Sequence, residues 1–255
     1  METEILTIAL WLLGGLIAIV GVVASIWKWI LVIRYLSLNR KHNVAGLTGQ
    51  QVAEELLNKL GLSEVAVKQC GFWRTFGGSG NSYSPRKKTI YLRGNIVNKS
   101  SLTAMALAAQ QVAVAKQDIE GDKVFKARRK FEVFGLTCAV TFIPIMLLGL
   151  LFDFLIENAV GIAFIISCVV AIGFFVCSII AQHLIIKSES AASKDAAMML
   201  SGFGMVNEAE LATVKKVYRT YLTEHIINYI LSIMVSLILM QQKRLFSSID
   251  QLRTS

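Results

Sequence analysis

The sequence predicts an α+β integral membrane protein that is mainly helical, with about four transmembrane helices and a small cytoplasmic domain. Hydrophobic residues make up 55% of the 255 residues, and charged residues only 17%, where soluble domains carry about 25%. This composition also excludes intrinsic disorder, which requires low hydrophobicity and high charge. The apolar residues gather in long runs, and most Lys and Arg residues lie between them, which is typical of membrane proteins.

Four apolar runs are candidates for membrane helices: Ile5–Trp27, Val133–Phe152, Ala159–Ile186 and Ile226–Met240. The first carries no charge and is long enough as a helix to cross a bilayer core of about 30 Å. Glu2 and Glu4 precede it where a cleaved signal peptide carries basic residues, so we expect an uncleaved anchor. The fourth run barely spans, and it must tilt, insert partly or extend through Glu224 and His225.

The distribution of charge predicts which segments face the cytoplasm. Lys and Arg are concentrated in residues 34–131 and 187–222, whereas the link from Phe152 to Ala159 carries only acidic charges. The positive-inside rule therefore places the N-terminus outside a plasma membrane of bacterial inner-membrane type and both basic segments in the cytoplasm. Lys243, Arg244 and Arg253 conflict with this rule if the fourth run crosses fully. The predicted organisation is an anchor (1–34), a cytoplasmic segment (35–131), a membrane helix pair (132–186), a cytoplasmic helical segment (187–222), and a C-terminal membrane helix with its tail (223–255).

This sorting accounts for most of the net charge of +9. No basic motif with interleaved aromatic residues supports nucleic-acid binding, so nucleic acid is not expected as a partner.

The segment 35–131 predicts a small mixed domain. Thr48 and Gln51 form a capping-box pattern at the start of an amphipathic helix. Short strands are expected near residues 65–67 and at Thr89–Leu92, with a glycine- and serine-rich loop over Phe76–Tyr83 and a turn at 84–87. Ser100 or Ser101 is expected to cap the next helix, which continues through residue 112.

Five short motifs occur in the order found in one family: Gly46-Leu47-Thr48-Gly49, Tyr83-Ser84-Pro85, Lys88-Thr89-Ile90-Tyr91-Leu92, Ser101-Leu102-Thr103-Ala104, and the helix ending Ala108-Ala109-Gln110-Gln111-Val112-Ala113-Val114-Ala115. The chain resembles the YugP-type membrane zinc metallopeptidases over most of its length. The resemblance implies a zincin-like cytoplasmic domain in which a helix carrying Ala-Ala-His-Glu-Val-Gly-His-Ala holds catalytic zinc.

The chain departs from this family at the catalytic motif, where it reads Gln110-Gln111-Val112-Ala113-Val114. In a His-Glu-x-x-His motif, two histidines on one helix face bind zinc and the glutamate takes a proton from zinc-bound water. Gln110 offers only an amide oxygen, Val114 offers no ligand, and the neutral amide of Gln111 cannot act as a base. Zinc is therefore expected to be absent, and no catalytic residue is assigned.

The family's downstream acidic ligand corresponds to Glu189, in the pattern Glu189-Ser190-Ala191-Ala192-Ser193. We interpret Glu189 as a remnant ligand, with an ordinary solvated helix face as the alternative. The histidines, His42, His183 and His225, are far apart in the sequence. A substitute metal site of His183, Glu189 and Asp195 is a minor alternative, because catalytic zinc requires three well-placed protein ligands.

We expect a catalytically inactive member, or pseudoprotease, that acts through protein–protein contacts as scaffold or regulator of a membrane protease or assembly. A peptide could add to an exposed strand edge at Thr89, Ile90, Tyr91 and Leu92. The expected partners are the lipid bilayer and another membrane protein, either an active peptidase or a second copy, since Gly14, Gly15 and Gly21 suit close helix packing. The alternatives are an active peptidase with non-standard metal ligands and a channel- or transporter-like protein.

Overall fold

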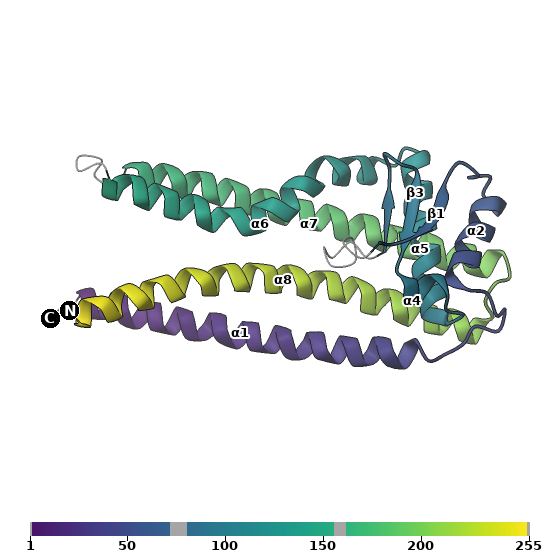
Figure 1. Cartoon of the computed structure of the whole chain (residues 1–255), viewed down its shortest axis with the longest axis horizontal. Helices are drawn as coiled ribbons and strands as arrows, with labels where there is room; N and C mark the ends of the chain where they lie inside the picture. The colour runs from purple at the N-terminus through teal and green to yellow at the C-terminus, as the bar shows by residue number, and fades with distance from the viewer. Residues whose placement is uncertain (1, 72–80, 156–161, 254–255) are drawn as a thin grey trace. The chain divides into compact units, whose positions relative to one another are not determined.

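The computed structural model describes residues 2–71, 81–155 and 162–253, and these divide into two compact units (Figure 1). Unit 1 comprises residues 1–29, 130–183 and 226–255, and unit 2 comprises residues 30–129 and 184–225. Four long helices contribute residues to both units: α1 (Glu2–Leu38), α6 (Lys123–Leu155), α7 (Ile162–Gly202) and α8 (Glu208–Arg253).

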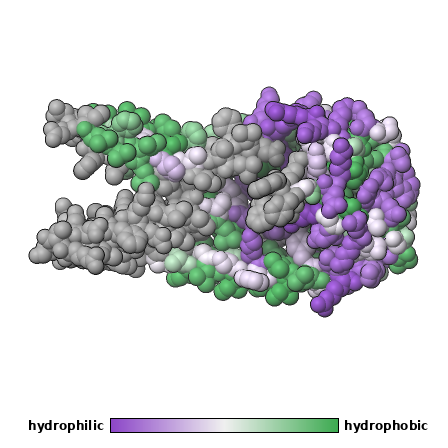
Figure 2. Space-filling view, in the orientation of Figure 1, coloured by the Kyte–Doolittle hydropathy of each residue, from purple (hydrophilic) through white to green (hydrophobic). Residues whose placement is uncertain are grey.

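Two of these helices are long and apolar enough to cross a membrane: α1 over Ala18–Leu38, and α7. Only 11% of the apolar window of each is buried, whereas the core helix of a soluble protein buries most of its apolar side chains. Figure 2 shows apolar residues along described parts of the long helices and hydrophilic residues over unit 2.

The prediction of four membrane helices is corrected to two among the described residues. Among the described residues of α6, the apolar stretch is Pro144–Asp153, which is shorter than a membrane span. Helix α8 is long, but charged and polar residues lie on both sides of its apolar run, and its described residues contain no stretch long and apolar enough to cross a bilayer.

Within unit 1, helices α6 and α7 form an antiparallel hairpin that has two local causes. The Asp153 carboxylate accepts hydrogen bonds from the backbone amides of Ala163 (3.1 Å) and Phe164 (2.8 Å), which satisfies unpaired donors of the first turn of α7. A Cβ added at Gly149 would lie 2.0 Å from Ser167 Oγ, so only glycine allows this close approach.

Unit 2 contains a three-stranded sheet and three shorter helices beside the long ones (Figure 1). The helices are α2 (Gly49–Lys59), α4 (Gly94–Val97) and α5 (Leu102–Ile119). The strands β1 (Ala66–Gln69), β2 (Ser82–Ser84) and β3 (Thr89–Leu92) lie in the order β1-β3-β2. Strand β3 pairs parallel with β1 and antiparallel with β2.

This topology corrects the prediction that Thr89, Ile90, Tyr91 and Leu92 form a peptide-binding edge. They form β3, the central strand, whose backbone groups are paired on both sides. Sequence composition identifies a strand but not its neighbours, because strand order depends on contacts distant in sequence. The expected loop over Phe76–Tyr83 is also partly wrong, since Ser82 and Tyr83 belong to β2; residues 76–80 of that loop lie outside the described residues.

The expected helix starts are confirmed. The Thr48 hydroxyl accepts the Gln51 amide (3.3 Å), and the Gln51 side chain accepts the Thr48 amide (2.9 Å), which completes a capping box. Ser101 caps α5 by accepting the amide of Ala104 at 3.1 Å. Helix α5 is buried along almost its entire length and forms the core of unit 2 together with α2, α4 and the sheet.

We predict that Gly49→Ala destabilises unit 2 by about 1–3 kcal/mol, the usual effect of overpacking. An added Cβ would lie 2.4 Å from the carbonyl oxygen of Ile96, a backbone atom that cannot rotate away. Thermal unfolding of detergent-purified protein measures the effect. Gly202→Ala is the control, since its Cβ would meet nothing within 4 Å, and equal melting temperatures for both variants would contradict the prediction.

Candidate functional site

The candidate site lies where α5 faces α7 within unit 2. Gln110, Val114 and Gln117 are spaced four and then three residues apart on α5, so they share one face of that helix. Gln110 is 0% exposed, Gln111 3% and Val114 4%. The positions that correspond to a peptidase motif are therefore buried inside the domain.

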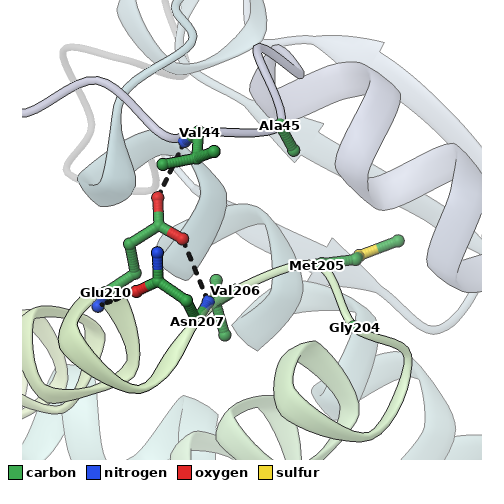
Figure 3. Close-up of a pocket in the computed structure, with 7 residues that line it drawn as sticks. All are labelled: Val44, Ala45, Gly204, Met205, Val206, Asn207 and Glu210. Carbon is green, nitrogen blue, oxygen red and sulfur yellow. Dashed lines mark hydrogen bonds between the residues drawn. The ribbon is translucent and has the colours of Figure 1, made fainter.

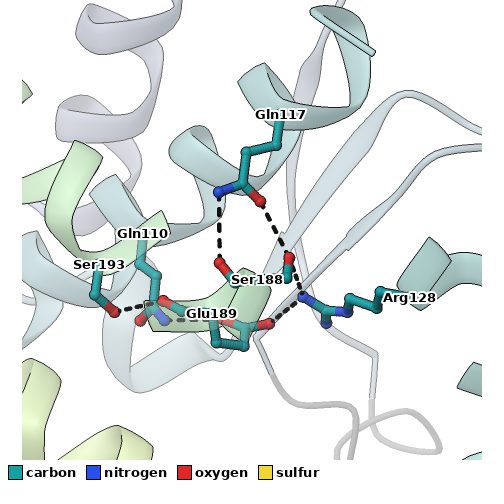
Figure 4. A network of polar contacts seen from close by, with 6 residues as sticks. All are labelled: Gln110, Gln117, Arg128, Ser188, Glu189 and Ser193. Carbon is teal, nitrogen blue, oxygen red and sulfur yellow. Dashed lines mark hydrogen bonds and ion pairs between the residues drawn. The ribbon is translucent and has the colours of Figure 1, made fainter. Parts of the chain in front are cut away.

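The structure brings Gln110 and Glu189 together, although 79 residues separate them. Gln110 Nε2 donates a hydrogen bond of 2.9 Å to Glu189 Oε2 (Figure 4). Glu189 is only 3% exposed, so the alternative of a solvated helix face is wrong. This contact also fixes the amide orientation of Gln110, because turning Oε1 toward the carboxylate would place two acceptors together.

Arg128, near the start of α6, supplies the counter-charge. Its Nη1 lies 2.7 Å from Glu189 Oε1, and the two side chains are 12% and 4% exposed. The same nitrogen donates to Ser188 Oγ at 3.3 Å. Both carboxylate oxygens of Glu189 are thus engaged by protein donors, one charged and one neutral.

A second pair of contacts holds α7 against α5 about two helical turns further along the same face of α5. Ser188 Oγ donates to Gln117 Oε1 at 3.1 Å, and Gln117 Nε2 donates to the Ser188 carbonyl at 3.4 Å. Within α7, Ser193 Oγ donates to the Glu189 carbonyl at 2.8 Å (Figure 4). The Gln110–Glu189–Arg128 contacts therefore belong to a wider polar network inside the core.

Helix α8 adds two half-buried aromatic residues, Tyr221 and His225, whose rings meet edge to face with centroids 4.6 Å apart. Burial raises the pKa of Tyr221 well above its ordinary value, and the Glu189 charge raises it further. Burial lowers the pKa of His225 below 6.5; the Glu189 and Glu224 charges oppose this effect, and the Arg128 charge adds to it.

The donor set does not fit catalytic zinc. Such a site needs three protein ligands among His, Cys, Asp and Glu, and no cluster of three such residues occurs in residues 2–71, 81–155 and 162–253. The substitute set of His183, Glu189 and Asp195 is accordingly not brought together as a metal-binding group. Glu189 on α7 is of a zinc-binding type, whereas the motif positions on α5 carry two amides and a valine.

Sequence reasoning missed Arg128 as a member of this site, because Arg128 stands in a run of basic residues that indicated only membrane topology. It also missed Gln117 and Ser188. A usable signal was the spacing of Gln117 seven residues after Gln110, which places two polar side chains on one face of an otherwise apolar helix.

A pocket of about 270 Å³ lies elsewhere in unit 2, lined by Val44, Ala45, Gly204, Met205, Val206, Asn207 and Glu210 (Figure 3). The Glu210 carboxylate accepts the backbone amides of Val44 (2.7 Å) and Asn207 (3.1 Å), and Asn207 Oδ1 accepts the Glu210 amide at 2.8 Å. These bonds cap α8 and hold the loop before α2. The charged group of the pocket thus has a structural role.

Comparison with known proteins gave one family. A family model described as "Putative neutral zinc metallopeptidase" matches residues 11–244, nearly the whole chain, which confirms the resemblance of the sequence motifs. Neither the comparison with curated proteins nor that with solved structures gave a match.

We predict that acidification from pH 7.5 to 5.5 destabilises the protein, in part through His225. Its pKa is lower in the folded state, so the unfolded chain binds more protons as the pH falls through about 6.5. Stability then falls by at most about 1.4 kcal/mol per pH unit for this one group, down to the folded pKa. Melting temperatures across this range should depend less on pH in His225→Gln than in the parent protein. The exposed His42 provides the control: if His42→Gln and His225→Gln behave alike, the prediction is wrong.

Proposed function

Because the chain belongs to the family of putative neutral zinc metallopeptidases, we propose that it is a catalytically inactive member. It acts in the membrane through protein–protein contacts, as a scaffold or regulator of a membrane protease or of another membrane assembly. Unit 2 is the part that contacts partners, and the two apolar helices retain the chain in the bilayer. The distribution of basic residues supports a cytoplasmic location for unit 2.

One observation carries this proposal: Glu189 is bonded to Gln110 and Arg128 in a buried site that has no other zinc-binding side chain at the motif positions. Zinc-dependent hydrolysis requires an open coordination position for water and a base beside it. Gln111 occupies the position of that base, and a neutral amide takes no proton at neutral pH. An intact fold around such a site supports a role in binding.

Metal content tests the proposal directly. We expect detergent-purified protein, dialysed against metal-free buffer, to contain far less than one zinc per chain by mass spectrometry, and to show no hydrolysis of unstructured protein substrates. Stoichiometric zinc together with hydrolysis would contradict the proposal and favour an active peptidase with non-standard ligands. Ion flux in protein-containing liposomes would favour the channel-like alternative.

The strand edge that supports partner binding is β1. The amides of Ala66 and Cys70 bond to the carbonyls of Lys88 and Leu92. In a parallel pair, the intervening alternate residues Val67 and Gln69 direct their backbone groups away from β3. No described strand pairs with this outer edge, and Gln69 is exposed. An extended segment of a partner protein could therefore add beside β1.

We predict that Gln69→Pro abolishes partner binding at β1 while leaving the fold intact. Proline removes the outward amide of residue 69, and prolines are tolerated on edge strands. The matched control is Gln69→Ala, which retains the amide and should bind normally. Quantitative co-purification from membranes, with partners identified by mass spectrometry, measures the difference. Equal recovery of every partner with both variants would exclude β1 as the binding edge.

A further inference from the structure

We propose that the Arg128 guanidinium has taken over the electrostatic role of a bound metal ion and closes this site to divalent cations. This inference rests on the proposed function, because it takes the native site to be free of zinc. It assigns to Arg128 two consequences: neutralisation of the buried Glu189 carboxylate, and exclusion of metal from the position at which the family binds it.

The burial of Glu189 makes a counter-charge necessary. Its side chain is 4% exposed, and an isolated carboxylate in such surroundings is strongly unfavourable. Gln110 contributes one neutral hydrogen bond to Oε2, which leaves the net charge unbalanced. Arg128 Nη1, 2.7 Å from Oε1, supplies the positive charge that a metal ion would supply in an active relative.

The guanidinium is a fixed cation, because Arg stays protonated at all physiological pH values. Its position is defined by a second contact, the hydrogen bond to Ser188 Oγ, and Ser188 is in turn held by Gln117. Arg128 thus joins α6 to α7 at the point where α7 packs on α5. Unlike a zinc ion, this cation is covalently part of the chain and cannot be removed by a chelator.

Arg129, the next residue, shows that this arrangement is specific. Its side chain is 50% exposed and its Nη1 lies 3.7 Å from Asp118, so this ion pair is longer and more open to solvent than the pair of Arg128 and Glu189. The two neighbouring arginines therefore have the same charge and nearly the same sequence position but different surroundings, and Arg129 serves as the matched control.

Rebuilding the family motif tests the exclusion of metal. The triple variant Gln110→His, Gln111→Glu and Val114→His supplies two imidazoles and a base. In this variant the Arg128 guanidinium still forms its ion pair with Glu189 Oε1, and its positive charge repels a divalent ion. We expect the addition of Arg128→Gln to tighten zinc binding at least tenfold, measured by competition with a chromophoric chelator. The addition of Arg129→Gln to the same triple variant should change the affinity less than threefold.

Two results would overturn the proposal. If the triple variant binds zinc as tightly as the variant that also carries Arg128→Gln, Arg128 does not exclude metal. If neither variant binds zinc, something other than Arg128 keeps the ion out. Stoichiometric zinc in the unmodified protein would instead overturn the proposed function, so the two failures are distinguishable.

A double-mutant cycle in the otherwise unmodified protein tests the counter-charge role, even if the rebuilt variants fold poorly. Arg128→Gln leaves Glu189 buried without its cation and should lower the melting temperature more than the double variant Arg128→Gln with Glu189→Gln does. Arg128→Lys, which keeps the charge, should recover part of the loss. For Arg129→Gln with Asp118→Asn we expect nearly additive shifts, because the two groups lie 3.7 Å apart and Arg129 is 50% exposed. Additive effects for Arg128 and Glu189 as well would overturn the proposal.

Discussion

The requirement that a carboxylate buried in a helical core must be neutralised determines much of unit 2. Glu189 lies on α7, and its two oxygens are bonded to Gln110 on α5 and Arg128 on α6. A carboxylate removed from water is tolerated only with charged or multiple hydrogen-bond donors around it. Because these donors come from different helices, satisfying one side chain fixes the register of three helices. The surrounding contacts of Ser188, Gln117 and Ser193 extend the same constraint along α5 and α7.

The departures at the motif are mutually consistent. An imidazole that binds zinc presents a lone pair to the metal, whereas the Gln110 amide presents a proton to Glu189, which suits a carboxylate and not a cation. Val114 lies one turn further along the same buried face and contributes no ligand. Gln110 and Val114 bring no positive charge to Glu189, and Arg128 supplies one. The site is therefore a buried polar network centred on the Arg128–Glu189 ion pair.

The sequence predicted those features that depend on local chemistry. The capping box at Thr48 and Gln51, the cap at Ser101 and strand Thr89–Leu92 are confirmed, because each depends on residues within a few positions of one another. The central place of β3 and the ion pair of Arg128 were not predictable in the same way. Both depend on partners more than 20 residues away in the sequence, and a basic residue in a basic run carries no signal of burial. The number of membrane helices also differs from the prediction, since among the described residues only α1 and α7 contain a stretch long and apolar enough to span.

A buried ion pair of this kind contributes more to the uniqueness of a fold than to its net stability. The desolvation of two charges offsets most of their attraction, and an apolar replacement of the same shape can be equally stable. Removing one partner is nevertheless strongly unfavourable, so helix arrangements that separate Arg128 from Glu189 are excluded from the native state. Under the proposed function, this restriction favours binding, because it presents α5, the sheet and the outer edge of β1 to a partner in one arrangement. Under the proposed function, the buried glutamate and its arginine define the structure on which binding depends.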